Sequence, residues 1–298
     1  MILFLNGHKS YIAIMSSPLY YAIDNNHIEA AELLIQSGAD MYKEDESKLY
    51  PPLYLAICKQ NIDMVRLLIR YGVDVNIGDC CRITPLEYAS GWNIDIMKLL
   101  IDNGANVNTK PGDGWTPIGQ AARHGHIDQV RLLIDHGADV NATDQSNWRA
   151  LQKAASANHI EVMKLLMENG TNQESLNKAL CTLGGSYSVE SFQLLIDRGA
   201  VVTYDAVYSA IWIGRRVLLK LLLDNGGDAY LRSSISRGDI PLHTAVMNLN
   251  DAYGITSLLL EEGVPVNIRD RDNISTLDYA IANKCPDDVI QLLKDHGG

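Results

Sequence analysis

The residues of this sequence that could do chemistry are first of all its histidines, and His124 and His126 stand only two positions apart. A neutral imidazole can serve as a general base or as a metal ligand. His27, His126 and His159, however, occupy one recurring position, which indicates a structural role in bonding the turn between two helices. His124 has no such explanation, and it stays a candidate for a ligand contact beside Arg123.

No other segment has the spacing of a catalytic or cofactor motif. The glycines of residues 112–119 (GDGWTPIG) lack the following Lys-Ser/Thr that phosphate binding needs, and residues 184–188 (GGSYS) lack the spacing of a nucleophile elbow. The acidic pairs at 287–288 and 261–262 are typical of helix exteriors or ends. We therefore predict no catalytic residue, no metal site and no cofactor, and we expect that the protein is not an enzyme.

The composition bounds the possible partners. Of 298 residues, 47% are hydrophobic and 20% are charged, which is enough apolar material for a continuous core. The net charge of −11 repels polyanions, so nucleic acid is not an expected partner. The apolar run at residues 1–5 is too short for a signal peptide or a membrane span. Five scattered cysteines fit a reducing compartment, and we expect a cytoplasmic protein without a membrane partner.

The elements that position these residues repeat along the chain. The string Leu-Leu-x-x-x-Gly and its variants recur at intervals of 27 to 37 residues. A repeat period of about 33 residues predicts a solenoid, in which each repeat buries its apolar face against its neighbours. The chain holds nine such repeats, which end at Gly38, Gly72, Gly104, Gly137, Gly170, Gly199, Gly226, Gly263 and Gly297.

Each repeat is expected to hold two helices. A proline opens the first helix in several repeats, because its fixed φ suits the first turn. The second helix carries an apolar stripe, as in VRLLIRYG at residues 65–72, and its final glycine fits a left-handed position. A small packing residue recurs in the first helix, at Ala22, Ala56, Ala89, Ala121, Ala154, Ala210, Ala245 and Ala280.

The string T-P-L at residues 84–86, the G-H pair at 125–126 and GADVNA at 137–142 together resemble the ankyrin repeat. The resemblance extends over residues 16–298 and is strongest in the first five repeats. It implies an all-α repeat solenoid, in which antiparallel helix pairs are joined by β-hairpin fingers and stack into a section with a concave face. Residues 1–15 would then be an N-terminal extension or cap.

The resemblance also implies structural roles for two recurring positions. The residue after the leucine of T-P-L often bonds a turn in the family, and here it is Tyr20, Tyr54, Glu87, Gln152 or His243. The asparagine of the V-N pair is expected to bond the finger backbone, at Asn76, Asn108, Asn141 and Asn267.

Several repeats depart from this pattern. Those ending at Gly199 and Gly226 are short and lack T-P-L, which predicts that their fingers are reduced or missing. The next repeat is long, and residues 230–243 (YLRSSISRGDIPLH) are expected to form an extended, exposed finger. The last repeat carries the charged residues that a polar outer cap would need, Lys284, Asp287, Asp288, Lys294 and Asp295.

In proteins similar to this one, partners dock on the fingers and on the inner helix face. All four tryptophans of the chain fall at such positions. Tryptophan and arginine dominate interface energies because a rigid, amphipathic group buries much area at low entropic cost. A finger tryptophan that only packs on the next finger is the alternative. The partner-binding residues that we expect are Trp92, Trp115, Arg123, His124, Trp148 and Trp212.

Two classes of function fit this pattern. The leading interpretation is a monomeric protein–protein interaction scaffold, which binds a partner with a basic surface on the concave face and fingers. The alternative is an enzyme or small-molecule-binding protein, with a pocket on the concave face or in the irregular segment 170–240. That pocket would be walled by Trp212, Tyr208, Tyr204, Arg215 and Arg216.

Overall fold

The computed structural model describes residues 17–42, 51–79, 81–109, 115–183, 188–230 and 240–298. The expected N-terminal extension and most of the long finger lie outside these residues. The chain divides into two compact units. The first unit is formed by Met1–Ala150 with Glu168–Gly170, and the second by Leu151–Met167 with Thr171–Gly298.

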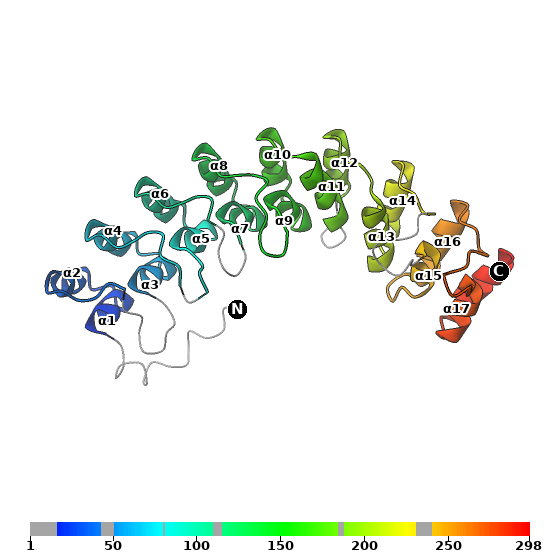
Figure 1. The fold of residues 1–298 in the computed structure, drawn as a ribbon, viewed down its shortest axis with the longest axis horizontal. Helices are drawn as coiled ribbons and strands as arrows, with labels where there is room; N and C mark the ends of the chain where they lie inside the picture. The colour runs from blue at the N-terminus through cyan, green and yellow to red at the C-terminus, as the bar shows by residue number, and fades with distance from the viewer. Residues whose placement is uncertain (1–16, 43–50, 80, 110–114, 184–187, 231–239) are drawn as a thin grey trace. The chain divides into compact units, whose positions relative to one another are not determined.

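The first unit contains four helix pairs. The first helix of each pair lies beside the first helix of the next pair, and the second helices form a parallel row (Figure 1). The pairs are α1 (Pro18–Asp24) and α2 (Ile28–Gln36), α3 (Pro52–Cys58) and α4 (Ile62–Arg70), α5 (Pro85–Ser90) and α6 (Ile94–Asp102), and α7 (Pro117–Arg123) and α8 (Ile127–Asp135).

The second unit is also built of helix pairs. Ala150, at the start of α9, and Glu168, at the end of α10, belong to the first unit. The helices of the second unit are α9 (Ala150–Ser156), α10 (Ile160–Glu168), α11 (Gln173–Thr182), α12 (Val189–Asp197), α13 (Tyr204–Ile213), α14 (Arg216–Asp224), α15 (Pro241–Val246), α16 (Ala252–Glu261), α17 (Thr276–Ala282) and α18 (Asp287–Asp295). The predicted all-α repeat solenoid is therefore confirmed.

The helices begin and end where the local sequence specifies it. In α7, the Thr116 hydroxyl accepts the Gly119 N–H at 3.1 Å, and Pro117 follows as the first helical residue. The same hydroxyl cap occurs at Ser17, Thr84, Thr203 and Ser275. Each second helix is followed by one of the nine glycines of the repeat, with φ from +81° to +92°. This left-handed conformation favours glycine because it has no Cβ.

Alanines and leucines build the core between neighbouring pairs. The predicted packing alanines are at most 3% exposed, and Ala179 of α11, which the sequence pattern missed, is 0% exposed. One leucine of each second helix from α4 onward is also fully buried. These are Leu68, Leu100, Leu133, Leu166, Leu195, Leu222, Leu259 and Leu293. Burying a leucine contributes about 1.5–3 kcal/mol, so this row is a main source of cohesion between the repeats.

Asparagine side chains link successive repeats. The Asn108 Nδ2 donates to the Gly137 carbonyl at 2.9 Å, and its Oδ1 accepts the Asp139 N–H at 2.8 Å. Asn76 makes the equivalent pair of bonds with Gly104 and Asn106. Asn141 and Asn267 likewise donate to Gly170 and Gly297. The sequence predicted a bond to the finger backbone. The side chains bond the backbone of the next repeat, at the carbonyl of the glycine that follows its second helix and, for Asn76 and Asn108, also at the N–H two residues later.

Other side chains make this link where asparagine is missing. The Tyr42 hydroxyl lies 3.3 Å from the Gly72 carbonyl, and the Tyr230 hydroxyl donates to the Glu262 carbonyl at 3.1 Å. In α11, two residues share the task. Gln173 Nε2 donates to the Gly199 carbonyl at 2.7 Å, and Asn177 Oδ1 accepts the Val201 N–H at 2.8 Å.

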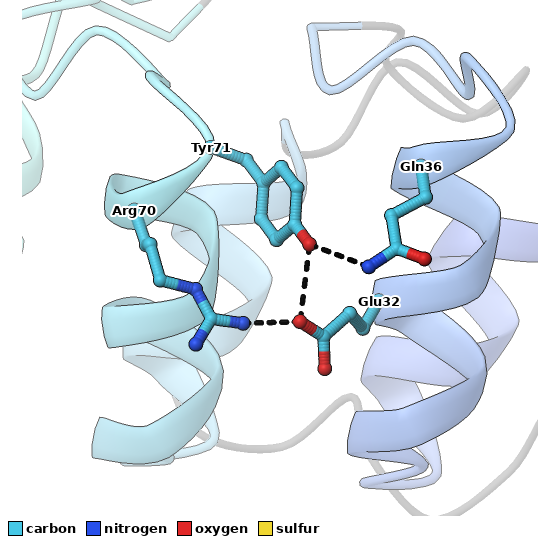
Figure 2. Close-up of polar contacts among 4 residues, drawn as sticks. All are labelled: Glu32, Gln36, Arg70 and Tyr71. Carbon is cyan, nitrogen blue, oxygen red and sulfur yellow. Dashed lines mark hydrogen bonds and ion pairs between the residues drawn. The ribbon is translucent and has the colours of Figure 1, made fainter.

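A polar cluster joins the second helices α2 and α4 at the surface. Figure 2 shows Glu32 accepting hydrogen bonds from Arg70 and from the Tyr71 hydroxyl, which in turn accepts the Gln36 amide N–H at 2.8 Å. The Arg70 side chain is 61% exposed, so this ion pair is screened by water and contributes little to stability. We interpret the cluster as a contact between neighbouring repeats rather than as a reactive site.

Candidate binding surface

The fingers that precede α5, α9 and α17 share one loop geometry. In the finger at 144–148, the Asp144 N–H donates to the Trp148 carbonyl at 2.9 Å, and Asp144 Oδ1 accepts the Trp148 N–H at 2.8 Å. Asn147 takes a left-handed φ of 60° between them. The fingers at 79–83 and 270–274 have the same bonds. Among the described residues, antiparallel bridges flank two of these fingers, which are thus hairpin-like.

Side chains of the first helices hold these fingers in place. The Tyr54 hydroxyl lies 2.6 Å from the Ile77 carbonyl and also bonds the Ile83 carbonyl. In the second unit, His243 Nε2 lies 3.3 Å from the Ile274 carbonyl. The predicted turn-bonding role is therefore confirmed for Tyr54 and His243. Tyr54 and His243 each hold a finger residue that lies just before the first helix of the following repeat.

Four of the predicted binding residues lie together in the first unit. The ring centroids of Trp92 and His124 are 6.0 Å apart, and His124 also stacks on His126 at 5.7 Å. The Arg123 guanidinium lies over the Trp115 ring, with Cζ 4.4 Å from the centroid. Trp92 is 58% exposed. We call Trp92, Trp115, Arg123 and His124 the tryptophan cluster.

A cavity of about 300 Å³ opens between the two tryptophans of this cluster. Its walls come from the finger and first helix of one repeat and from the start of the next. The lining residues are Ile83, Glu87, Tyr88, Trp92, Trp115 and Gln120. Aromatic walls with a few polar groups are typical of recognition pockets.

Beneath the cavity lies a buried aromatic and acidic layer. The Tyr88 hydroxyl donates to Asp79 Oδ2 at 3.3 Å, and the Tyr54 and Tyr88 rings meet edge to face at 5.1 Å. Asp79 and Glu87 are 8% and 6% exposed. Burial raises the pKa of Tyr54, and the negative charges of Asp79 and Glu87 raise it further. Two nearly buried carboxylates therefore act on the same point of the first unit.

The other two tryptophans lie elsewhere. Trp148 is at its own finger, is 37% exposed and does not line the cavity. Trp212 belongs to the second unit, where it is 67% exposed and continues a stack of Tyr204 and Tyr208 along α13. Successive ring centroids in this stack are 5.8 and 6.4 Å apart, as the four-residue spacing on one helix face requires.

A cavity of the second unit lies apart from the pocket that was expected around Trp212. It measures about 500 Å³ and lies along α14 and α16, among second helices. Of the five residues predicted to wall a pocket, it includes Arg216 alone. Its lining residues are Val189, Arg216, Val217, Lys220, Leu221, Gly254, Ser257, Leu258 and Glu261.

For His27 and His126, two of the three recurring histidines, the structure shows no capping bond at the start of the second helix. His27 and His126 occupy the N-cap positions of α2 and α8 without a side-chain capping bond, and His126 Nδ1 is buried without a partner among the described residues. Asn61 and Asn93, at the same position of other repeats, do cap their helices. The imidazole lacks the short acceptor arm with which asparagine reaches the N–H groups of the first turn.

The described residues contain no group of three or more His, Cys, Asp and Glu side chains placed to hold a metal ion. Within the same ranges, none of the helices has the length and apolarity needed to span a bilayer. Burial raises the pKa of the Cys181 and Cys285 thiols, which keeps both protonated and weakly nucleophilic at neutral pH.

The family of the chain follows from its sequence match as well as from its fold. A model of ankyrin repeats matches residues 19–111, 93–177 and 207–298. The chain belongs to the ankyrin-repeat family, whose repeats are in general modules of protein–protein interaction. The stretch 178–206, which the matches leave out, falls in the repeats without fingers. No curated protein sequence matches the chain.

Proposed function

We propose that this protein is a binding scaffold that recognises a partner protein through the tryptophan cluster and the neighbouring fingers of its first unit. One observation carries the proposal: Trp92 and Trp115, from adjacent repeats, line one cavity, with Arg123 and His124 against their rings. Aromatic and arginine side chains gathered around a concave point are the usual composition of a binding hot spot. The scaffold is pre-organised because repeat stacking, not the partner, holds these side chains.

The charge of the chain indicates the chemistry of the partner. The net charge is −11, and the cavity lies above two buried carboxylates. A partner with a basic contact surface would be steered toward the chain and would bind more weakly at high salt. We further expect a monomer in the cytoplasm, and light scattering of the purified chain checks the oligomeric state.

The experiment is affinity capture from a soluble lysate of the source cells, followed by calorimetry with the purified partner. Trp92→Ala/Trp115→Ala is compared with wild type, and Trp212→Ala serves as a control of similar exposure in the second unit. The double variant is expected to weaken binding of the partner by at least about 2 kcal/mol. Unchanged affinity of the double variant would show that the binding surface lies elsewhere.

Small-molecule binding is the second candidate, supported by the cavity of about 500 Å³ along α14 and α16. Its lining is mostly apolar, with Arg216, Lys220, Ser257 and Glu261 as polar groups. Mass spectrometry of compounds retained by the purified protein tests this candidate. A retained compound that is lost in Leu258→Trp, which fills the cavity, would favour ligand binding over a pure scaffold.

A further inference from the structure

The cavity of the tryptophan cluster has the features that a guanidinium group requires. It combines aromatic rings, a buried hydrogen-bond acceptor and negative charge within about 300 Å³. We propose that this cavity takes an arginine side chain of the partner, packed against Trp92 and Trp115 with its N–H groups toward Glu87 and Gln120. This inference rests on the proposed function and specifies which part of the partner the site recognises.

The aromatic walls already show an affinity for guanidinium. Arg123 lies over Trp115 at 4.4 Å, although Arg123 itself is not part of the cavity lining. Trp92 is 58% exposed, so much of its surface is accessible from outside. A cation over an indole ring is attracted by the quadrupole of the ring, and tryptophan is the strongest of the aromatic side chains in this respect.

A buried acceptor in the lining has no hydrogen bond. Gln120 Oε1 is inaccessible to water and has no partner among the described residues. An acceptor in this condition destabilises the unliganded site, because it has lost its bonds to water without replacement. A guanidinium carries five N–H donors and no acceptor, so with the Gln120 amide turned toward the cavity it can donate to Oε1 and approach a carboxylate at the same time.

The charge at the base of the cavity selects a cation. Glu87 lines the cavity. Asp79 accepts a hydrogen bond from the hydroxyl of Tyr88, another lining residue. Both carboxylates are nearly buried, where charges are screened less than at the surface. Arginine fits better than lysine because its planar group can stack on a ring and donate in two directions, whereas an ammonium acts as a compact, strongly hydrated charge.

The test uses the four indole N–H signals in an NMR spectrum of the ¹⁵N-labelled chain, assigned through Trp→Phe variants. The probe is the peptide acetyl-Gly-Arg-Gly-amide, compared with peptides in which citrulline, lysine or norleucine replaces arginine. Citrulline keeps the shape of arginine and removes its charge. The arginine peptide is expected to shift Trp92 and Trp115 saturably while Trp148 and Trp212 stay fixed, with citrulline binding about tenfold more weakly.

Two results would overturn the proposal. One is the absence of any shift of Trp92 and Trp115, and the other is equal binding of the arginine, citrulline and norleucine peptides. The second result would mark the cavity as a general apolar pocket. Tighter binding of the lysine peptide than of the arginine peptide would contradict the role of the planar group.

Variants of the chain separate the two polar contacts. Gln120→Leu removes the acceptor with little change in size, and it is expected to keep its melting temperature but bind the arginine peptide several-fold more weakly. Glu87→Gln should weaken binding of arginine and leave citrulline unchanged. Glu190→Gln in α12, also in a first helical turn, is the matched control. Wild-type affinity in both Gln120→Leu and Glu87→Gln would overturn the proposed contacts.

The two proposals can fail separately. If Trp92→Ala/Trp115→Ala loses the partner while no arginine peptide binds wild type, the scaffold function stands and the arginine pocket is wrong. If the double variant retains the partner, the scaffold surface is misplaced, and the peptide titration still decides what the cavity accepts.

Discussion

The repeats with fingers and the repeats without them stack through the same kind of buried core but differ in the segments that connect them. The first helices of the fingered repeats α5–α6 and α9–α10 have six and seven residues, whereas those of α11–α12 and α13–α14 have ten. Only residues 169–172 and 198–203 separate these longer helices from the helices before them, in place of a finger. Both kinds of repeat bury the same alanine and leucine positions. The fingers are therefore dispensable for stacking, and they supply surface that can serve recognition.

The largest effect should come from the shared core. Leu100→Ala in a fingered repeat and Leu195→Ala in a fingerless repeat should each lower the free energy of unfolding by about 2–5 kcal/mol, since both leucines are fully buried. Urea unfolding followed by circular dichroism measures the loss. Leu249→Ala is the control, because this side chain is 99% exposed. A much smaller loss for Leu195→Ala would mean that fingerless repeats do not rely on the common core.

An intermediate effect is expected from the links between repeats. Asn108→Ala removes two bonds to the next repeat and should cost about 1–2 kcal/mol of unfolding free energy. Gln173→Ala and Asn177→Ala each remove one of the two equivalent bonds in α11, so each should cost roughly half as much. Asn103→Ala is the control, since among the described residues its amide bonds only the Leu99 carbonyl of the helix that it caps.

The same urea titrations decide this second comparison. If Asn108→Ala is no more destabilising than Asn103→Ala, the asparagine links do not stabilise the stack. If Gln173→Ala alone lowers the free energy of unfolding as much as Asn108→Ala does, Gln173 and Asn177 do not contribute equally to the link between repeats.

The smallest effect concerns the start of the second helices, which does not depend on the fingers. Ser188 caps α12 of a fingerless repeat and Asn93 caps α6 of a fingered one, whereas His126 does not cap α8. His126→Asn should raise the free energy of unfolding by about 0.5–1 kcal/mol, as Asn93 already caps α6 in the preceding repeat. His126→Ala removes the ring without adding a cap and should give no such gain. Equal stability of the two variants would rule out capping as the cause.

The sequence by itself determined the helix pairs and their ends. Glycine at a left-handed position, proline after Thr84 or Thr116, and leucines at helical spacing act within a few residues, so they can be recognised without neighbours. The same local signals identified which repeats lack a finger. They also placed the four tryptophans at positions that do not build the core, where sequence reasoning expected a partner.

Only the tertiary structure decided which side chains meet across repeats. It brought Trp92 and Trp115 to one cavity with Gln120 and left Trp148 at a separate finger. It also showed that Gln173 and Asn177 bond the next repeat, which no local sequence motif predicts. It further showed that His27 and His126, at N-cap positions, do not cap their helices. The contacts across repeats join residues more than twenty positions apart in the chain, and their existence depends on the distance and angle at which one helix pair stacks on the next.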